Sequence, residues 1–164
     1  MATEGSSVSA EQPFSPWRMS TLVHLAYASQ AVADFPDAAL AKILERARST
    51  NASLGVTGIL LHVDRSFFQI LEGEADVLAP LYAKIALDKR HARVAKLIEE
   101  PLDHRDFANW SMGLANATTK ELAAVPGLND FFTTRRTLDS MDEGTSRRLL
   151  GAFREGRWRA RVGP

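Results

Sequence analysis

Four polar side chains stand where the surrounding sequence is apolar, and they are the residues best placed to do chemistry. Tyr27 and Ser29 lie in the run LVHLAYAS, and Gln69 lies in the run SFFQILE. Asn51 ends a segment whose apolar residues have helical spacing. A buried phenol or amide needs a hydrogen-bond partner, because leaving it unpaired costs about 1 to 3 kcal/mol. These groups therefore either satisfy one another and the backbone, or they bind a ligand.

Motifs of the common catalytic classes are missing from the sequence. We find no GxSxG nucleophile turn, no phosphate-binding P-loop and no GxGxxG dinucleotide motif. The histidines lack the paired spacing of a metal site. We therefore expect structural roles for His24, His62, His91 and His104. The chain has no cysteine, so redox chemistry would need an organic cofactor. We predict a protein that is not an enzyme and binds no metal.

The composition favours one domain with short extensions. The chain has 164 residues, 45% of them hydrophobic, and its 20 basic and 20 acidic residues give a formal net charge of zero. This balance argues against general electrostatic attraction to nucleic acid or anionic membranes. The first 20 residues lack the features of a signal peptide and are interpreted as a flexible leader. No window reaches the ~20 apolar residues of a membrane span, so we expect a cytoplasmic protein.

Apolar periodicity predicts the elements that must position the polar groups. The alternation in LVHLAYAS places Tyr27 and Ser29 on the same face of a strand. Helical spacing after Pro36 predicts an amphipathic helix that ends near Asn51. Two β-rich runs separated by residues 64–65 predict a hairpin. The predicted order is strand, helix, strand, strand, helix, strand, strand, over residues 22–29, 37–51, 55–63, 66–72, 76–88, 95–99 and 110–114.

This βαββαββ order is that of a ferredoxin-like split βαβ sheet with one added strand. We therefore predict an α+β domain with a five-stranded mixed sheet. Right-handed crossovers would place both helices on one face of that sheet. By analogy with this topology, the first and third strands are central neighbours. Tyr27 and Gln69 should then approach each other across the sheet.

The tail has a different character from the rest of the chain. Eight arginines lie within residues 135–161, interrupted by four acidic residues. Residues 140–143 fit a helix-capping box, and two short helical stretches are expected. An apolar stripe is formed by Leu149, Leu150 and Phe153. We predict a domain over residues 21–117 and a C-terminal helical extension over 118–164, whose surface contacts protein in preference to phosphates.

Five blocks of sequence occur in one order across residues 22 to about 115. They are LVHLAYAS at 22–29, Asn51 with GVTG at 55–58, FFQILEG at 67–73, DKRH at 88–91, and RDF at 105–107 with WSM at 110–112. In content, order and spacing they resemble the BLUF family, whose members sense blue light with FAD. A single block is a weak signal, but the five together are specific. The resemblance implies bound FAD and a sensory role.

The resemblance also implies roles for individual positions. It places the photoactive tyrosine at Tyr27 and its glutamine partner at Gln69. Residues of the last strand that respond to light fall on Trp110 and Met112. Contacts to the flavin are implied for Tyr27, Ser29, Ile43, Thr50, Asn51, Gln69, Leu71, Lys84, Asp88, Arg90 and His91. Two positions depart from the family pattern: Thr50, where many relatives have Asn or His, and His24, where arginine is common.

A flavin ring is flat, with apolar faces and hydrogen-bonding groups along one edge, so its pocket should combine apolar walls with convergent amides. We expect walls from Ile43, Leu44, Leu78 and Ile85. Because the chain has no glycine loop for phosphates, FMN or riboflavin should be able to replace FAD. The resemblance implies that light moves an electron from Tyr27 and a proton through Gln69. The Gln69 amide is then left rearranged, and the spectrum shifts to the red.

Output is expected to pass through noncovalent contact with a signalling protein that the sequence does not identify. We also expect a homodimer or larger homo-oligomer. The main alternative is a small flavin-dependent oxidoreductase, for which we identify no nicotinamide site. An acylphosphatase-like hydrolase would need an arginine loop after the first strand, and residues 30–33 do not form one. An RNA-binding sheet would need a basic-aromatic third strand, which is also missing.

Overall fold

The secondary-structure elements follow the predicted order along the chain. The structure, a computed structural model, describes residues 21–63, 65–109, 111–116, 118, 120, 124 and 143–154. The strands are β1 (Leu22–Ala31), β2 (Thr57–Val63), β3 (Ser66–Glu74), β4 (His91–Pro101) and β5 (Gly113–Asn116). The helices are α1 (Asp37–Leu54), α2 (Ala75–Ala86) and α5 (Glu143–Arg154). None of these helices is both long and apolar enough to cross a membrane.

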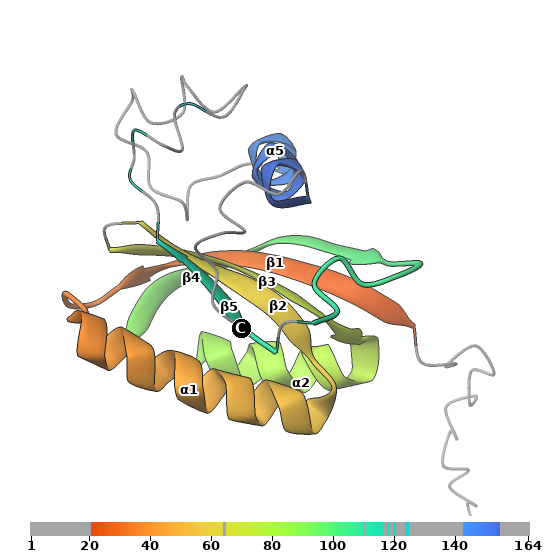
Figure 1. Cartoon of the computed structure of the whole chain (residues 1–164), viewed down its shortest axis with the longest axis horizontal. Helices are drawn as coiled ribbons and strands as arrows, with labels where there is room; N and C mark the ends of the chain where they lie inside the picture. Colours follow the sequence, from red (N-terminus) through yellow and green to blue (C-terminus); the bar gives the residue numbers. More distant parts are fainter. Residues whose placement is uncertain are drawn as a thin grey trace, which may run out of the picture.

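The five strands form one sheet in the order β4-β1-β3-β2-β5 (Figure 1). β1 pairs antiparallel with β3 and β4, β2 pairs antiparallel with β3, and β5 lies parallel to β2, so the sheet is mixed. In this register Tyr27 is directly opposite Gln69, which confirms the predicted approach. Gly58 permits the close approach of β2 to β3, because a Cβ there would lie 2.1 Å from the Ile70 carbonyl oxygen.

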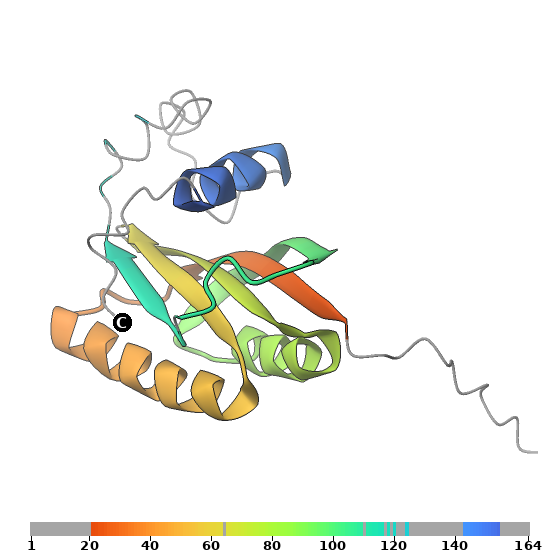
Figure 2. The ribbon, with the colours of Figure 1, turned by 45° about the vertical axis from the view of Figure 1, so that its right-hand side comes forward.

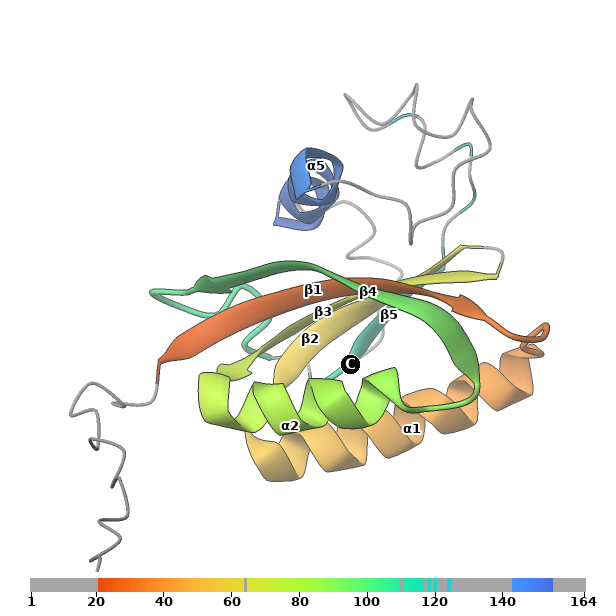
Figure 3. The ribbon, with the colours of Figure 1, turned by 180° about the vertical axis from the view of Figure 1, so that it is seen from behind.

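Two helices, α1 and α2, cover the same face of the sheet, as Figures 1 and 3 show. Between the helices and the sheet lies an apolar core that includes Val23, Leu25, Leu40, Leu44, Leu71 and Leu78. α1 begins after Pro36, whose carbonyl accepts the N–H groups of Ala39 and Leu40. It ends at Gly55, which adopts a left-handed φ of 66° that glycine takes without strain.

The opposite face of the sheet is covered by α5 (Figure 2). Side chains that alternate with those of the helix-side core are buried on this face, among them Ile59, Phe68, Ile70 and Ile98. Leu149 and Leu150 of α5 are also buried, in keeping with the predicted apolar stripe. Arg147 ties α5 to β4, because its guanidinium donates two hydrogen bonds to the Glu100 carboxylate.

The structure differs from the sequence-based expectation at the last two strands of the sheet. β4 begins at His91 and not at Ala95, and β5 begins at Gly113 and not at Trp110. β4 is an edge strand with register irregularities opposite β1, and Arg93 within it has a φ of 56°, so its apolar alternation is interrupted. The predictions for the leader, for Trp110, for the Phe153 side chain, for residues 140–142 and for the first tail helix lie outside the described residues.

Candidate functional site

A cavity of about 290 Å³ lies on the helix side of the sheet. Its walls come from α1 and α2, and its floor comes from the central strands. Twelve of the residues to which the resemblance assigns a role line it: Tyr27, Ser29, Ile43, Thr50, Asn51, Gln69, Leu71, Lys84, Asp88, Arg90, His91 and Met112. The structure therefore brings together in one place residues that are far apart in the chain. Trp110 lies outside the described residues.

Tyr27 and Gln69 form the buried polar centre of the cavity. The Tyr27 hydroxyl donates to Gln69 Oε1, and Gln69 Nε2 donates to the Met112 sulfur at 3.2 Å. Burial raises the pKa of Tyr27, and the neighbouring Tyr82 and Asp88 raise it further. Tyr27 is therefore a protonated donor at neutral pH. Its hydrogen bond assigns the oxygen end of the Gln69 amide to the tyrosine and the nitrogen end to Met112.

A second tyrosine, Tyr82, packs against Tyr27. The rings of Tyr27 and Tyr82 meet edge to face, with centroids 5.6 Å apart and an interplanar angle of 62°. Lys96 places its ammonium 5.7 Å from the centroid of the Tyr82 ring. Tyr82 thus supports the position of Tyr27, and a surface cation stabilises Tyr82 in turn.

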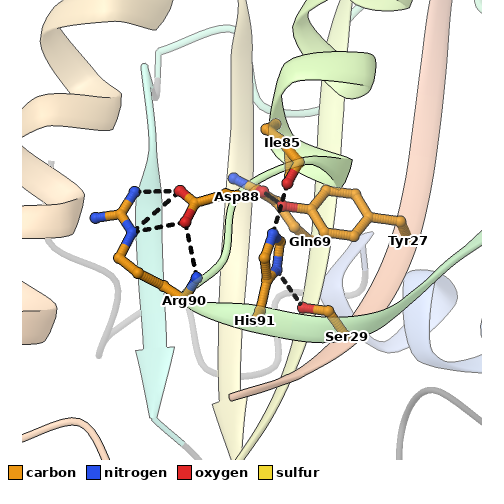
Figure 4. Close-up of polar contacts among 7 residues, drawn as sticks. All are labelled: Tyr27, Ser29, Gln69, Ile85, Asp88, Arg90 and His91. Carbon is orange, nitrogen blue, oxygen red and sulfur yellow. Dashed lines mark hydrogen bonds and ion pairs between the residues drawn. The ribbon is translucent and has the colours of Figure 1, made fainter. Parts of the chain in front are cut away.

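His91, which lines the cavity, links α2, β4 and β1 through the contacts in Figure 4. Its Nε2 lies 2.6 Å from the Ile85 carbonyl oxygen, and its Nδ1 lies 2.9 Å from the Ser29 hydroxyl. A carbonyl oxygen only accepts hydrogen bonds, so Nε2 must carry the proton. In the neutral ring Nδ1 then accepts from Ser29. His91 thereby holds the end of α2 and the start of β4 against β1.

Positive charge gathers at the exposed edge of the cavity. Arg46, Lys84 and Arg90 line it and are exposed to solvent. Arg90 also donates from Nε to both carboxylate oxygens of Asp88 at 3.0 Å (Figure 4). This pairing lowers the pKa of Asp88 to about 2, so Asp88 stays ionised at neutral pH. The edge of the cavity is suited to an anionic part of a ligand.

Two side chains of α1 hold the backbone just before β5. Asn51 Nδ2 donates to the Ser111 carbonyl at 2.9 Å, and Arg48 Nε donates to the Met112 carbonyl at 2.8 Å. Asn51 is buried, and its amide has a second end that can accept a hydrogen bond from a ligand. The residue predicted to bind the flavin edge therefore also positions the segment that contains Met112.

A buried carboxylate organises the loop between β4 and β5. Glu72 is fully buried and accepts hydrogen bonds from the backbone N–H groups of Asp106 and Phe107 and from the Thr57 hydroxyl. Burial raises the pKa of Glu72, although these donors oppose the rise. Arg105 closes the network by donating to Thr57 and to backbone carbonyls. The loop that leads into β5 is thus fixed to β2 and β3.

Sequence reasoning missed some lining residues and misplaced one. The missed residues are Phe35, Arg46, Ala47, Leu60, Phe67 and Leu81. Phe67 could have been found, because it shares a strand face with Gln69 by the period of two. Leu44 and Ile85 line the cavity as expected. Leu78 was expected in a wall but is instead fully buried in the core near Gly73.

Comparison with known proteins identifies what this arrangement is similar to. A sequence model of the BLUF family, described as sensors of blue-light using FAD, matches residues 22–113. The photoactivated adenylate cyclase subunit beta of Euglena longa is 40% identical over 112 residues, which are 68% of this chain and 13% of that protein. The chain spans only 11 to 13% of the length of the cyclase subunits that it matches.

Solved structures show the same fold. BlsA in its photo-activated state matches with a TM-score of 0.70 and 29% identity, over 81% of this chain and 94% of that one. BlrB, described as a BLUF protein in its dark state, matches with a TM-score of 0.62 and 31% identity, over 82% of this chain and 98% of that one. These matches confirm the predicted ferredoxin-like fold class.

Proposed function

The chain belongs to the BLUF family of blue-light sensors that use FAD, and from that premise we propose that its cavity holds the flavin ring against Tyr27 and Gln69. The observation that carries this proposal is the hydrogen-bonded run from Tyr27 through Gln69 to Met112 on the cavity wall. Ile43, Leu44 and Ile85 supply apolar surface for the faces of the ring. The amides of Asn51 and Gln69 supply donors and acceptors for its edge.

The size and charge of the cavity are suited to a flavin ring inside it and to the phosphates of the cofactor outside it. A volume of about 290 Å³ is near the lower end of the range of ~300 to 1,000 Å³ for small-molecule sites. The ring would lie inside, and Arg46, Lys84 and Arg90 at the edge would face the negatively charged diphosphate. FMN or riboflavin can replace FAD, because the buried contacts are made to the ring.

Gln69 is the proposed switch. A bound flavin would supply blue-light absorption and an excited state that can take an electron from a nearby phenol and return it afterwards. Tyr27 is placed to lose the electron, and its hydroxyl proton faces Gln69 Oε1. Rearrangement of the Gln69 amide exchanges its donor and acceptor ends without changing its volume. Gln69 would then give up its hydrogen bond to the Met112 sulfur and would be free to donate to the flavin.

We propose that this switch signals through protein contact and that the chain itself catalyses no reaction. Met112 directly precedes β5, so a change at Gln69 reaches the segment that leads toward the tail. A homodimer or larger homo-oligomer and a separate signalling protein are the proposed partners. The cytoplasmic location stays a prediction. The buried Tyr27–Gln69 pair favours a flavin-based light sensor over a flavin-dependent oxidoreductase.

An absorption experiment tests the proposed function. The purified protein, supplied with FAD where needed, should be yellow and should shift its spectrum reversibly to the red under blue light. A colourless protein that fails to bind added FAD would contradict the binding proposal. Steady NAD(P)H oxidation without a light-induced shift would favour the oxidoreductase.

A further inference from the structure

Side chains of a helix hold the backbone just before β5. The ladder between β2 and β5 runs from the pair Ile59–Gly113 to the pair His62–Asn116. Ser111 and Met112 lie just before it. Their carbonyls accept hydrogen bonds from Asn51 and Arg48 of α1 instead. The position of the segment that enters the last strand is therefore set by side chains of α1.

Arg48 is the stronger of the two donors. Its guanidinium is always charged and planar, and a charge-assisted hydrogen bond is about twice as strong as a neutral one. The side chain is partly buried, which limits competition from water. Met112 itself is fully buried. Met112 is thus held at two points, its sulfur by Gln69 and its carbonyl by Arg48.

We propose that Arg48 is a positioning residue that sets the Met112 sulfur against Gln69 and couples this contact to α1. The light-dependent part of this inference rests on the proposed function. If Gln69 rearranges, Met112 loses the hydrogen bond to its sulfur and keeps the hydrogen bond from Arg48 to its carbonyl. A displacement of Met112 would therefore act first on α1, through Arg48. Arg48 is not among the residues that line the cavity. Its substitution therefore tests the coupling without removing a ligand contact, unlike substitution of Asn51.

Hydrogen exchange on the flavin-free protein tests the dark part of the inference. Arg48→Met removes the donor and keeps much of the aliphatic length, whereas Arg48→Gln replaces the charged donor with a shorter, neutral amide. Lys42→Gln is the matched control, because it removes one positive charge from an exposed site of the same helix. The Arg48 variants should exchange the amides of residues 113–116 about ten-fold faster or more, while the control matches the parent protein. Equal exchange in all four proteins would overturn the proposal.

The flavin-loaded protein tests the coupling to the switch. The Arg48 variants should bind flavin and shift to the red as the parent does, since the cavity is unchanged. Their return in the dark should be several-fold slower, because the Met112 sulfur is no longer held where it accepts the dark-state hydrogen bond of Gln69 Nε2. A return rate equal to that of Lys42→Gln would overturn the coupling. A parent protein without any light-induced shift would refute the proposed function instead, and the exchange result would still decide whether Arg48 holds β5.

Discussion

The two hydrogen bonds of Gln69 differ in strength, and this difference would suit Gln69 to the proposed switch. Its oxygen faces the Tyr27 hydroxyl, whose raised pKa keeps the proton in place. Its nitrogen faces the sulfur of Met112, which is a weak acceptor. Rotation of the Gln69 amide therefore breaks only the weak hydrogen bond to Met112. A ligand carbonyl would accept a stronger hydrogen bond from the same nitrogen.

Removing either member of the pair should abolish the optical switch and leave binding intact. We expect Tyr27→Phe and Gln69→Leu to retain flavin, because the apolar walls are untouched, and to lose the red shift. Light-minus-dark difference spectra measure this. Tyr82→Phe is the control, since it changes the chain's other tyrosine, which packs on Tyr27 without a hydrogen bond to Gln69. A normal shift in Tyr27→Phe or Gln69→Leu would remove that residue from the switch.

Asn51 should contribute to affinity rather than to switching. Asn51→Ala would leave hydrogen-bonding groups on the edge of the flavin ring without a partner. It also removes the donor to the Ser111 carbonyl. We expect a loss of about 1 to 3 kcal/mol, or about 5-fold to 150-fold in the dissociation constant for FAD. Equilibrium titration measures it, with the exposed Ser49→Ala on the same helix as control. Unchanged affinity would exclude Asn51 from the site.

Elements with a strong apolar periodicity could be predicted from the sequence. Elements that are held by hydrogen bonds to side chains far away in the sequence could not. The alternation in β1 and β3 correctly placed Tyr27 and Gln69 on one face. The start of β5 was misplaced, because Met112 has strand-like neighbours but gives its carbonyl to Arg48, 64 positions away. Nothing local in the sequence signals that bond. The Glu72 network was missed for the same reason, since Asp106 and Phe107 are brought to it only by the fold.

The Glu72 network should make the stability of the protein depend on pH in a defined direction. The pKa of Glu72 is raised from its ordinary value of 4.5 in the folded chain. At a pH between the ordinary pKa of the unfolded chain and the raised pKa of the folded chain, Glu72 keeps its proton only in the folded state. The contribution of Glu72 to the free energy of unfolding therefore falls as the pH rises through this interval. Glu72→Gln has no titrating group at this position. It should also be less stable by about 1 to 3 kcal/mol near pH 4.5, because its nitrogen cannot accept the backbone N–H bonds.

Urea unfolding of both proteins between pH 4.5 and 8, in steps of about half a unit, measures this dependence. The stability advantage of the parent over Glu72→Gln should shrink as pH rises. Glu45→Gln, at an exposed site of α1, should show no comparable trend. An advantage that grows with pH would contradict the assignment of Glu72 as the buried titrating group.

Helices α1 and α2 lie on one face of the sheet, and α5 lies on the other (Figure 2). The cavity lies between the sheet and α1 and α2, whereas α5 covers the other face. β4 connects the two sides, because His91 at its start contacts the cavity and Glu100 near its end binds Arg147 of α5. A shift of β4 would therefore reach groups on both faces of the sheet.

Light should alter the packing of α5 on the sheet. The Arg147–Glu100 pair is exposed and contributes at most about 1 kcal/mol, so the docking of α5 depends mainly on the buried Leu149 and Leu150. A small shift of β4 or β5 would be enough to change this contact. Hydrogen exchange should then show less protection of residues 146–150 under blue light than in the dark. Gln69→Leu should show no such difference. Identical protection of the parent in both states, with its red shift intact, would mean that the signal leaves through α1 or another route.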